Sequence, residues 1–364
     1  MKNKKLVIFF LVTLAVIVTA GIVSSLRSPQ STVEKTLLFP GLSDKINQVS
    51  RITVSGDKKS VELVEEGGDW RVASSANYPA IFSKVRSVAL NLSHMKIIDE
   101  KTSNPEFYDR LSVEDPNQKE ARSLLLTLEN NAGETLAKII VGQPRQSSSS
   151  KPGLYVRLPG EKTALLVEGQ LDISAEDTDW YIRDLIDIPS AVVKRVDITY
   201  PDGKTFGIFK ENRQQPDFDT TDKSAEKSSA SKIIINRISK GLEELRADGV
   251  KSPDNFTFPE ETTQTTFTTF DGIITTLTLA KVDDQAYARF NFSVDEALAD
   301  EADAATAASD AEEAKHVPKV REVVSNLSGR LEQWVYQIPD FKYEALTSNL
   351  DTLKKTVPAA DENT

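Results

Sequence analysis

The chain has 364 residues, a formal net charge of −11, two histidines and no cysteine. The absence of cysteine excludes disulfides, thiolate nucleophiles and cysteine-based zinc or iron–sulfur sites, and two histidines cannot form a multi-histidine metal site. The negative charge argues against nucleic acid as a partner, because phosphate backbones attract clustered Lys and Arg. We therefore expect no metal, no cofactor and no nucleic acid, in a chain long enough for about two domains.

An almost unbroken apolar run covers residues 6–26. A helix of this length, rising about 1.5 Å per residue, can cross a bilayer core of roughly 30 Å. Three lysines precede the run, so residues 1–30 are predicted to be a cytoplasmic N-terminus and transmembrane anchor. The rest is then the periplasmic ectodomain of a single-pass protein of the bacterial inner membrane. A cleaved signal peptide is the alternative, although its apolar region is usually shorter.

The remaining chain reads as two similar halves. Residues 49–55 resemble residues 193–199, and each segment leads through a turn into a second strand, as in a β-hairpin. A helical spacing of apolar residues follows in both halves, from Ile81 to Met95 and from Ile234 to Leu245. Further strands are predicted at 123–129, 135–141, 154–158 and 164–168 in the first half, and at 265–270, 273–282 and 286–292 in the second.

This self-similarity points to duplication of one sheet-plus-helix unit. We therefore predict an α+β fold in which the N-terminal transmembrane helix is followed by two similar lobes, at residues 37–189 and 190–345. A polar tail at 346–364 completes the chain. Trp180 and Trp334 close the two lobes and are expected in the core, with an exposed aromatic ligand cradle as the alternative.

Three polar segments, 143–153, 212–227 and 294–315, interrupt the repeat and are interpreted as loops or linkers. The last is an acidic insertion that could also form a solvated helix, because Ala and Glu favour helices. Its acids lack the glycine and the alternating ligands of a calcium loop, so a solvated run of charge is the favoured interpretation. The acids in question are Glu296, Asp300, Glu301 and Asp303.

No catalytic motif is complete. Asp202–Thr205 ends like a phosphate-binding loop, but Ile198 occupies the position of the required earlier glycine. Ser229 and Lys232 have the Ser-x-x-Lys spacing of penicillin-binding enzymes without the accompanying Lys-Thr-Gly element. His94 continues an apolar helix end and is predicted to be a partly buried structural residue. We therefore predict a non-enzymatic protein with no catalytic, cofactor-binding or metal-binding residues.

Short motifs also occur together along the first half and carry a family resemblance. They are Leu38-Phe39-Pro40-Gly41-Leu42, Ile52-Thr53-Val54, Trp70-Arg71-Val72, a helix ending at Asp99, and Val141-Gly142 with Gly153-Leu154-Tyr155-Val156-Arg157. Together they resemble the bacterial DUF4340 domain family, whose members are often encoded beside ABC-type transporters of the gliding-motility kind. The resemblance implies an accessory, membrane-tethered extracytoplasmic subunit that contacts an ABC permease and ATPase or another envelope protein. It supplies no active-site residue.

Three functions therefore stay open from the sequence. A scaffold would bind partners through an apolar patch, a strand edge or the cleft between the lobes. A hydrolase of envelope polysaccharide would need two acidic side chains close together in a cleft. A solute-binding module would need aromatic and polar groups that converge between the lobes. We expect the scaffold, because nothing in the spacing selects a pair of carboxylates.

Overall fold

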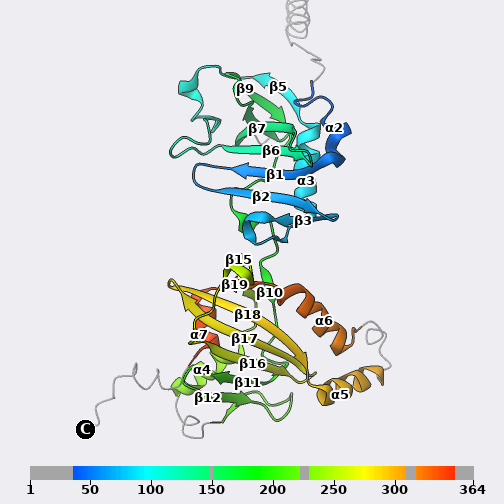
Figure 1. Cartoon of the computed structure of the whole chain (residues 1–364), viewed down its shortest axis with the longest axis vertical. Coiled ribbons are helices and arrows are strands. Elements are labelled where there is room, and N and C mark those ends of the chain that lie inside the picture. Colours follow the sequence, from blue (N-terminus) through cyan, green and yellow to red (C-terminus); the bar gives the residue numbers. More distant parts are fainter. Residues whose placement is uncertain (1–35, 147–150, 222–228, 309–316, 349–364) are drawn as a thin grey trace, which may run out of the picture.

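The computed structural model describes residues 36–146, 151–221, 229–308 and 317–348. Two large antiparallel sheets lie one above the other along the long axis (Figure 1). We call the part built on each sheet the first and the second lobe.

The first lobe contains a sheet of nine strands in the order β4-β3-β2-β1-β6-β7-β8-β9-β5. Its strands are β1 (Val49–Ser55), β2 (Ser60–Glu66), β3 (Asp69–Val72), β4 (Tyr78–Pro79), β5 (Lys96–Glu100), β6 (Leu124–Asn130), β7 (Thr135–Pro144), β8 (Gly153–Arg157) and β9 (Ala164–Glu168). Its helices are α2 (Leu42–Lys45) and α3 (Phe82–His94). The inward face of α3 buries Val85, Val88 and Leu92, whose spacing places them on one side of a helix.

The second lobe contains a sheet of eight strands in the order β13-β12-β11-β16-β17-β18-β19-β15. Its strands are β11 (Val193–Thr199), β12 (Thr205–Phe209), β13 (Asp219–Thr220), β15 (Gly249–Lys251), β16 (Thr263–Thr269), β17 (Ile273–Val282), β18 (Gln285–Val294) and β19 (Val335–Gln337). Its helices are α4 (Ser229–Ser239), α5 (Glu296–Ala307), α6 (Val320–Leu331) and α7 (Asp340–Leu346). Two further strands, β10 (Asp184–Ile186) and β14 (Leu245–Arg246), form a small separate sheet.

The centres of the two sheets have the same strand order. In the first, the hairpin β2-β1 is followed by β6-β7-β8, and in the second, the hairpin β12-β11 is followed by β16-β17-β18. Residue burial alternates along β1 and β11, so that Ile52 and Val196 face the core while Arg51 and Arg195 face outward. This alternation explains why both hairpins were visible in the sequence.

Two sequence predictions are wrong. In the described ranges the fold is mostly β-sheet with few helices, instead of the predicted α+β fold with a transmembrane helix. Short strands such as β4, β10 and β19 pair with other strands although their sequences are too short to show an alternation of apolar and polar residues. Within the described ranges, no helix is long and apolar enough to cross a membrane, which contradicts the predicted single-pass placement in the inner membrane. Residues 6–26, on which that placement rested, lie outside the described residues.

Candidate functional site

The segment that leaves the first lobe is bound along the second lobe. Its strand β10 pairs with β14, and the Ile188 amide donates to the Leu242 carbonyl at 3.0 Å. The Arg183 guanidinium donates to the Ala247 carbonyl at 2.8 Å and pairs with Asp248 at 2.6 Å. The connecting segment, residues 182–188, is therefore bound to the second lobe, and we call it the linker.

Aromatic rings from both lobes fill the joint between the two sheets. The Tyr78 ring meets Tyr181, Trp334 and Tyr336 edge-on, with centroid distances of 5.1, 4.8 and 6.1 Å. Tyr336 also meets Phe290 at 5.7 Å. All five side chains are buried. We call these five residues the joint cluster; they join the cores of the two lobes into one hydrophobic cluster.

The two tryptophans predicted to be core residues are confirmed as such, with exposed fractions of 0% for Trp180 and 8% for Trp334. The Trp180 indole donates to the Ser174 carbonyl at 2.9 Å. The Trp334 indole reaches across the joint and donates to the Ala76 carbonyl at 3.3 Å. These rings therefore serve packing, and they do not form an open cradle for a ligand.

Burial changes the acidity of the tyrosines in the joint cluster. It raises the pKa of Tyr181 to about 12, with a smaller contribution from the nearby negative charge of Asp177. Burial also raises the pKa of Tyr336 and of Tyr78. These phenols therefore stay neutral at physiological pH, and their role is to fill the joint rather than to exchange protons.

A cavity of about 710 Å³ lies in the second lobe, between the sheet and the helices α5 and α6. Its apolar lining residues come from three separate parts of the chain and include Phe270, Ile273, Leu298, Ala302, Val320 and Val323. Charged side chains also line it, namely Lys194, Glu211, Arg213, Asp271, Glu301 and Asp303. A mixed lining of this kind suits a peptide or a small amphipathic molecule better than a free ion.

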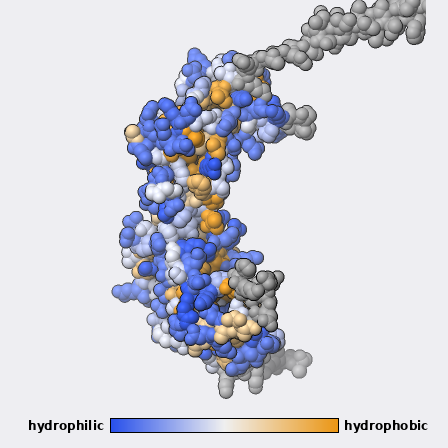
Figure 2. All heavy atoms as spheres, turned by 90° about the vertical axis from the view of Figure 1, so that its right-hand side faces the viewer, coloured by the Kyte–Doolittle hydropathy of each residue, from blue (hydrophilic) through white to orange (hydrophobic). Residues whose placement is uncertain are grey.

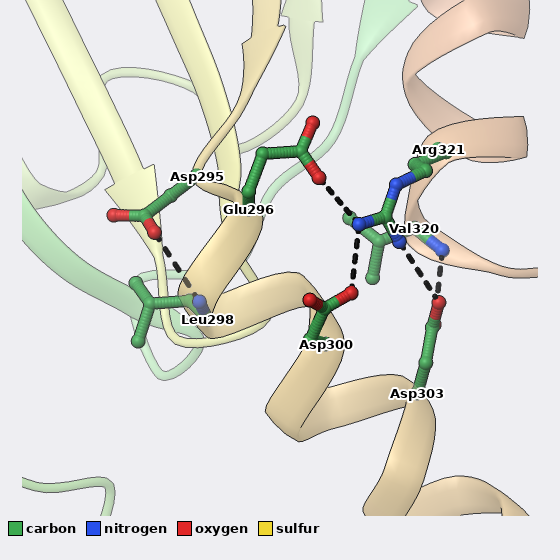
Figure 3. Close-up of polar contacts among 7 residues, drawn as sticks. All are labelled: Asp295, Glu296, Leu298, Asp300, Asp303, Val320 and Arg321. Carbon is green, nitrogen blue, oxygen red and sulfur yellow. Dashed lines mark hydrogen bonds and ion pairs between the residues drawn. The ribbon is translucent and has the colours of Figure 1, made fainter.

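Arg321 of α6 holds α5 beside it (Figure 3). Its guanidinium pairs with Asp300 at 2.7 Å, with Asp303 at 3.5 Å, and with Glu296. The three acids are four and three residues apart, so they lie on one face of α5. At the start of α5, the Asp295 carboxylate caps the helix by accepting the Leu298 amide at 3.2 Å.

Part of the acidic insertion forms a solvated helix, the alternative to the predicted loop. Of residues 294–315, residues 296–307 form α5, and residues 309–316 lie outside the described residues. Glu296 and Asp300 are largely exposed, as expected of a solvated run of charge, and together with Asp303 they share one arginine. The helical spacing of these acids could have indicated that they lie on one face of a helix, but their partner, Arg321, lies many residues further along the chain.

The described residues offer little for acid–base or metal chemistry. The three acids around Arg321 are engaged in ion pairs, and no group of three or more His, Asp or Glu residues in the described ranges could hold a metal ion. The pKa of Asp99 and that of Asp202 lie below the usual value, because each carboxylate accepts a hydrogen bond from a neighbouring lysine. A general acid would need a shift in the opposite direction.

The motif residues singled out in the sequence do not converge on one site. The Asp202–Thr205 segment forms the turn from β11 to β12, where Lys204 pairs with Asp202 at 2.8 Å. Ser229 and Lys232 belong to the first turn of α4. His94 is exposed, contrary to the prediction; it is the last residue of α3, and its Nδ1 lies 2.8 Å from the Leu90 carbonyl oxygen.

Two residues of the family motifs hold a long loop against the first sheet. The buried Arg157 donates to the Val113 carbonyl at 2.8 Å and pairs with Asp115 at 2.7 Å. A β-carbon on Gly142 would lie 2.3 Å from the Leu111 carbonyl oxygen, so only glycine fits there. These motif residues therefore have a structural role.

Comparison with known proteins identifies one family. The family model described as "Domain of unknown function (DUF4340)" matches residues 70–266, which is more than half of the chain. No curated protein and no solved structure matches the chain. The match runs from β3 of the first lobe into β16 of the second and so includes Tyr78 and Tyr181 of the joint cluster. The chain belongs to the DUF4340 family.

Proposed function

We propose that this protein is a non-enzymatic scaffold that holds a partner protein at a fixed position along its two lobes. The observation that supports this function best is the joint. The linker is bound along the second lobe, and the joint cluster fills the space between the sheets. Lobes joined by a small or polar interface usually move relative to one another, whereas a hydrophobic interface restrains them.

Aromatic packing in the joint also favours a permanent contact between the two lobes. Aromatic pairs contribute about 0.5–1.5 kcal/mol each beyond the burial of their area, and Tyr78 makes three such pairs across or along the joint. The β15 strand of the second sheet lies against residues Ala73–Ser75 of the first lobe. A rigid body with two lobes suits a protein whose task is to set a distance or an orientation.

The family resemblance supports one specific kind of scaffold, namely an accessory subunit of an ABC-type transport system. In that assembly the partner is the permease and its ATPase, or another envelope protein. Hydrolysis and solute capture have less support. Of the acids that line the cavity, Asp303 is paired with Arg321 and Asp271 with Arg213. The aromatic rings between the lobes pack against each other.

Affinity purification of the tagged full-length protein from its native host, after brief chemical cross-linking, tests this function. Mass spectrometry compares the eluate with that from cells that express the tag alone. Recovery of a permease and an ATPase, or of another envelope protein, in near-stoichiometric amounts is the expected result. Recovery of no partner, together with release of sugars from envelope polysaccharide by the purified protein, would contradict it.

A further inference from the structure

The cavity of the second lobe is formed by two helices that interrupt the repeated sheet. In the first sheet, β9 follows β8 after residues 158–163, whereas α5 and α6 come between the corresponding strands β18 and β19 of the second sheet. These helices form one wall of the cavity, and Arg321 joins them (Figure 3). Figure 2 views this side of the molecule, where hydrophobic residues lie among hydrophilic ones on the second lobe. The cavity is therefore an addition to the repeated fold.

Two lysines lie opposite each other where the sheet meets the cavity. Strands β11 and β12 pair Arg195 with Phe209, and the next pair is Lys194 with Lys210, whose amide donates to the Lys194 carbonyl at 2.8 Å. Lys194 lines the cavity and lies at a shift of register between β11 and β16. Such β-bulges often redirect a side chain beside a functional site. Like charges on directly opposite residues destabilise a sheet, so this pair of lysines opposes folding.

Neither lysine pairs with a carboxylate in the part of the chain that the structure describes. Lys210 is only 6% exposed, and its ammonium lies 4.5 Å from the centroid of the Phe218 ring. The ring offsets part of the cost of burying this charge, but it cannot neutralise it. Lys194 is half-buried, and Glu211, which follows Lys210, also lines the cavity. Two ammonium groups are therefore withdrawn from water beside the cavity.

The first lobe shows that the hairpin does not require these lysines. Strand β1 has the same shift of register against β6, and it falls at Ser50, which therefore corresponds to Lys194. The register of β1 and β2 places Glu65 opposite Ser50, so Glu65 corresponds to Lys210. The pair of like charges thus occurs only in the lobe that contains the cavity.

Acidic side chains also line the cavity, but they do not neutralise the lysines. Asp271 and Asp303 are each paired with an arginine. Glu211 and Glu301 are exposed, and water screens an exposed charge strongly. The two lysines are the charges here that are both shielded from water and without a carboxylate partner among the described residues. An anionic group is therefore what this end of the cavity lacks.

The remaining wall of the cavity is largely apolar. Half-buried side chains of the sheet and of both helices contribute to it, namely Phe270, Ile273, Leu298, Ala302 and Val323. The volume of about 710 Å³ lies within the range of small-molecule sites, roughly 300–1,000 Å³. A small inorganic anion would leave this apolar surface in contact with water, whereas an aliphatic chain would cover it.

We propose that the cavity binds an amphiphile of the fatty-acid class, with one anionic head group and one aliphatic chain. The head group pairs with Lys194 and Lys210, and the chain lies against Phe270, Leu298 and Val323. The site lies within the second lobe and differs from a solute-binding cleft between the lobes. It goes beyond the scaffold function and does not depend on it.

The test compares two amphiphiles with the same chain, dodecanoate and dodecyltrimethylammonium, by isothermal titration calorimetry of the full-length protein below micelle-forming concentrations. Dodecanoate should occupy one saturable site and bind at least about tenfold more tightly than the cation, because hydrogen bonds between charged groups are strong. Lys194→Gln with Lys210→Gln should weaken dodecanoate binding by at least about tenfold and abolish the preference for it.

Lys58→Gln with Lys138→Gln is the matched control, because it removes the same two charges from exposed lysines of the first lobe. It should bind dodecanoate like the wild type. Ala302→Trp tests the apolar part of the site separately: the indole fills the cavity and should abolish saturable binding. All these variants should melt close to the wild-type temperature, since none removes a buried apolar side chain or an ion pair.

Three results would overturn the inference. The first is that dodecanoate does not bind saturably, or binds no more tightly than the cation. The second is unchanged dodecanoate binding after Lys194→Gln with Lys210→Gln, or after Ala302→Trp. The third is a clearly lower melting temperature of the variant that lacks Lys194 and Lys210, because these lysines would then serve folding instead of a ligand.

Discussion

The Trp334 indole in the second lobe donates a hydrogen bond to the Ala76 carbonyl in the first lobe, at 3.3 Å. The same indole ring packs edge-on against Tyr78 at 4.8 Å. Ala76 has a φ of +55°, which an L-residue adopts only where its surroundings hold it. One side chain thus binds a turn of the first lobe through both its polar and its apolar parts.

Replacing Trp334 with Ala should destabilise the protein by about 3–5 kcal/mol, because a large buried ring leaves a cavity in the joint. Trp334→Phe is the control: it keeps much of the ring packing, removes the hydrogen bond and should cost much less. Urea unfolding followed by circular dichroism measures both effects. Equal stability of the Ala variant and the wild type would show that the joint cluster contributes nothing to the fold.

The tyrosines of the joint cluster predict a loss of stability in alkali. The pKa of Tyr181 is about 12 in the folded protein, against 10.0 for the ordinary group, so the folded state keeps a proton that the unfolded chain releases. The stabilisation is complete below pH 10 and is lost between pH 10 and pH 12; it amounts to at most about 3 kcal/mol. Tyr336 shifts in the same direction and adds to the effect.

Unfolding free energies measured from pH 8 to pH 11.5 test this dependence. Tyr181→Phe should make the decline above pH 10 shallower, whereas Tyr155→Phe, outside the joint, should leave it unchanged. A decline of the same steepness in the Tyr181→Phe variant would show that this phenol does not control the alkaline transition.

Gly142→Ala should displace the loop that covers the first sheet, because the added β-carbon would lie 2.3 Å from the Leu111 carbonyl oxygen and 2.8 Å from that of Ser112. We expect a loss of about 1–3 kcal/mol, as in other overpacked sites. Gly329→Ala is the matched control, because it has open space in helix α6 and should raise stability by about 0.5–1 kcal/mol. Similar melting temperatures for the two variants would contradict this account of Gly142.

Arg321→Gln should loosen α5. The substitution removes the charge that three carboxylates share, so amides of α5 should exchange with solvent several-fold faster in hydrogen–deuterium exchange. High salt should have a similar, weaker effect in the wild type. Arg195→Gln, which breaks a pair with Asp197 on the sheet, is the control and should leave exchange in α5 unchanged. Unaltered exchange in Arg321→Gln would mean that α5 is held by its packing alone.

The sequence predicted the local parts of the fold and missed those that depend on distant partners. The strands at 49–55 and 193–199 are confirmed as β1 and β11, because their alternation of burial is visible in the residue types. The edge strand β5 follows α3 directly but pairs with β9, far along the chain, and no periodicity reveals that partner. The two helical patterns lie in α3 and α4, but the strands outnumber the helices, so the fold is mostly β-sheet and the α+β prediction is wrong.

Only part of the candidate site could be predicted from the sequence. Glu296, Asp300 and Asp303 have the spacing of one helical face but were predicted only as part of a solvated run of charge, and nothing in the sequence identifies Arg321 as their partner. The contacts of the joint cluster could not be predicted, because Tyr78, Tyr181 and Trp334 come from three distant parts of the chain that only folding brings together. Exposure of Ile182 directly after two buried aromatic residues could not be deduced from composition.

The central claim, that the two lobes form one rigid scaffold, is tested most directly by a distance between them. The chain has no cysteine, so Lys58→Cys and Asp202→Cys place one spin label in the first hairpin turn of each lobe without further changes. Double electron–electron resonance should give a single narrow distance distribution in the wild-type background and a broader one after Trp334→Ala. A broad or bimodal distribution in the wild-type background would contradict the rigid scaffold.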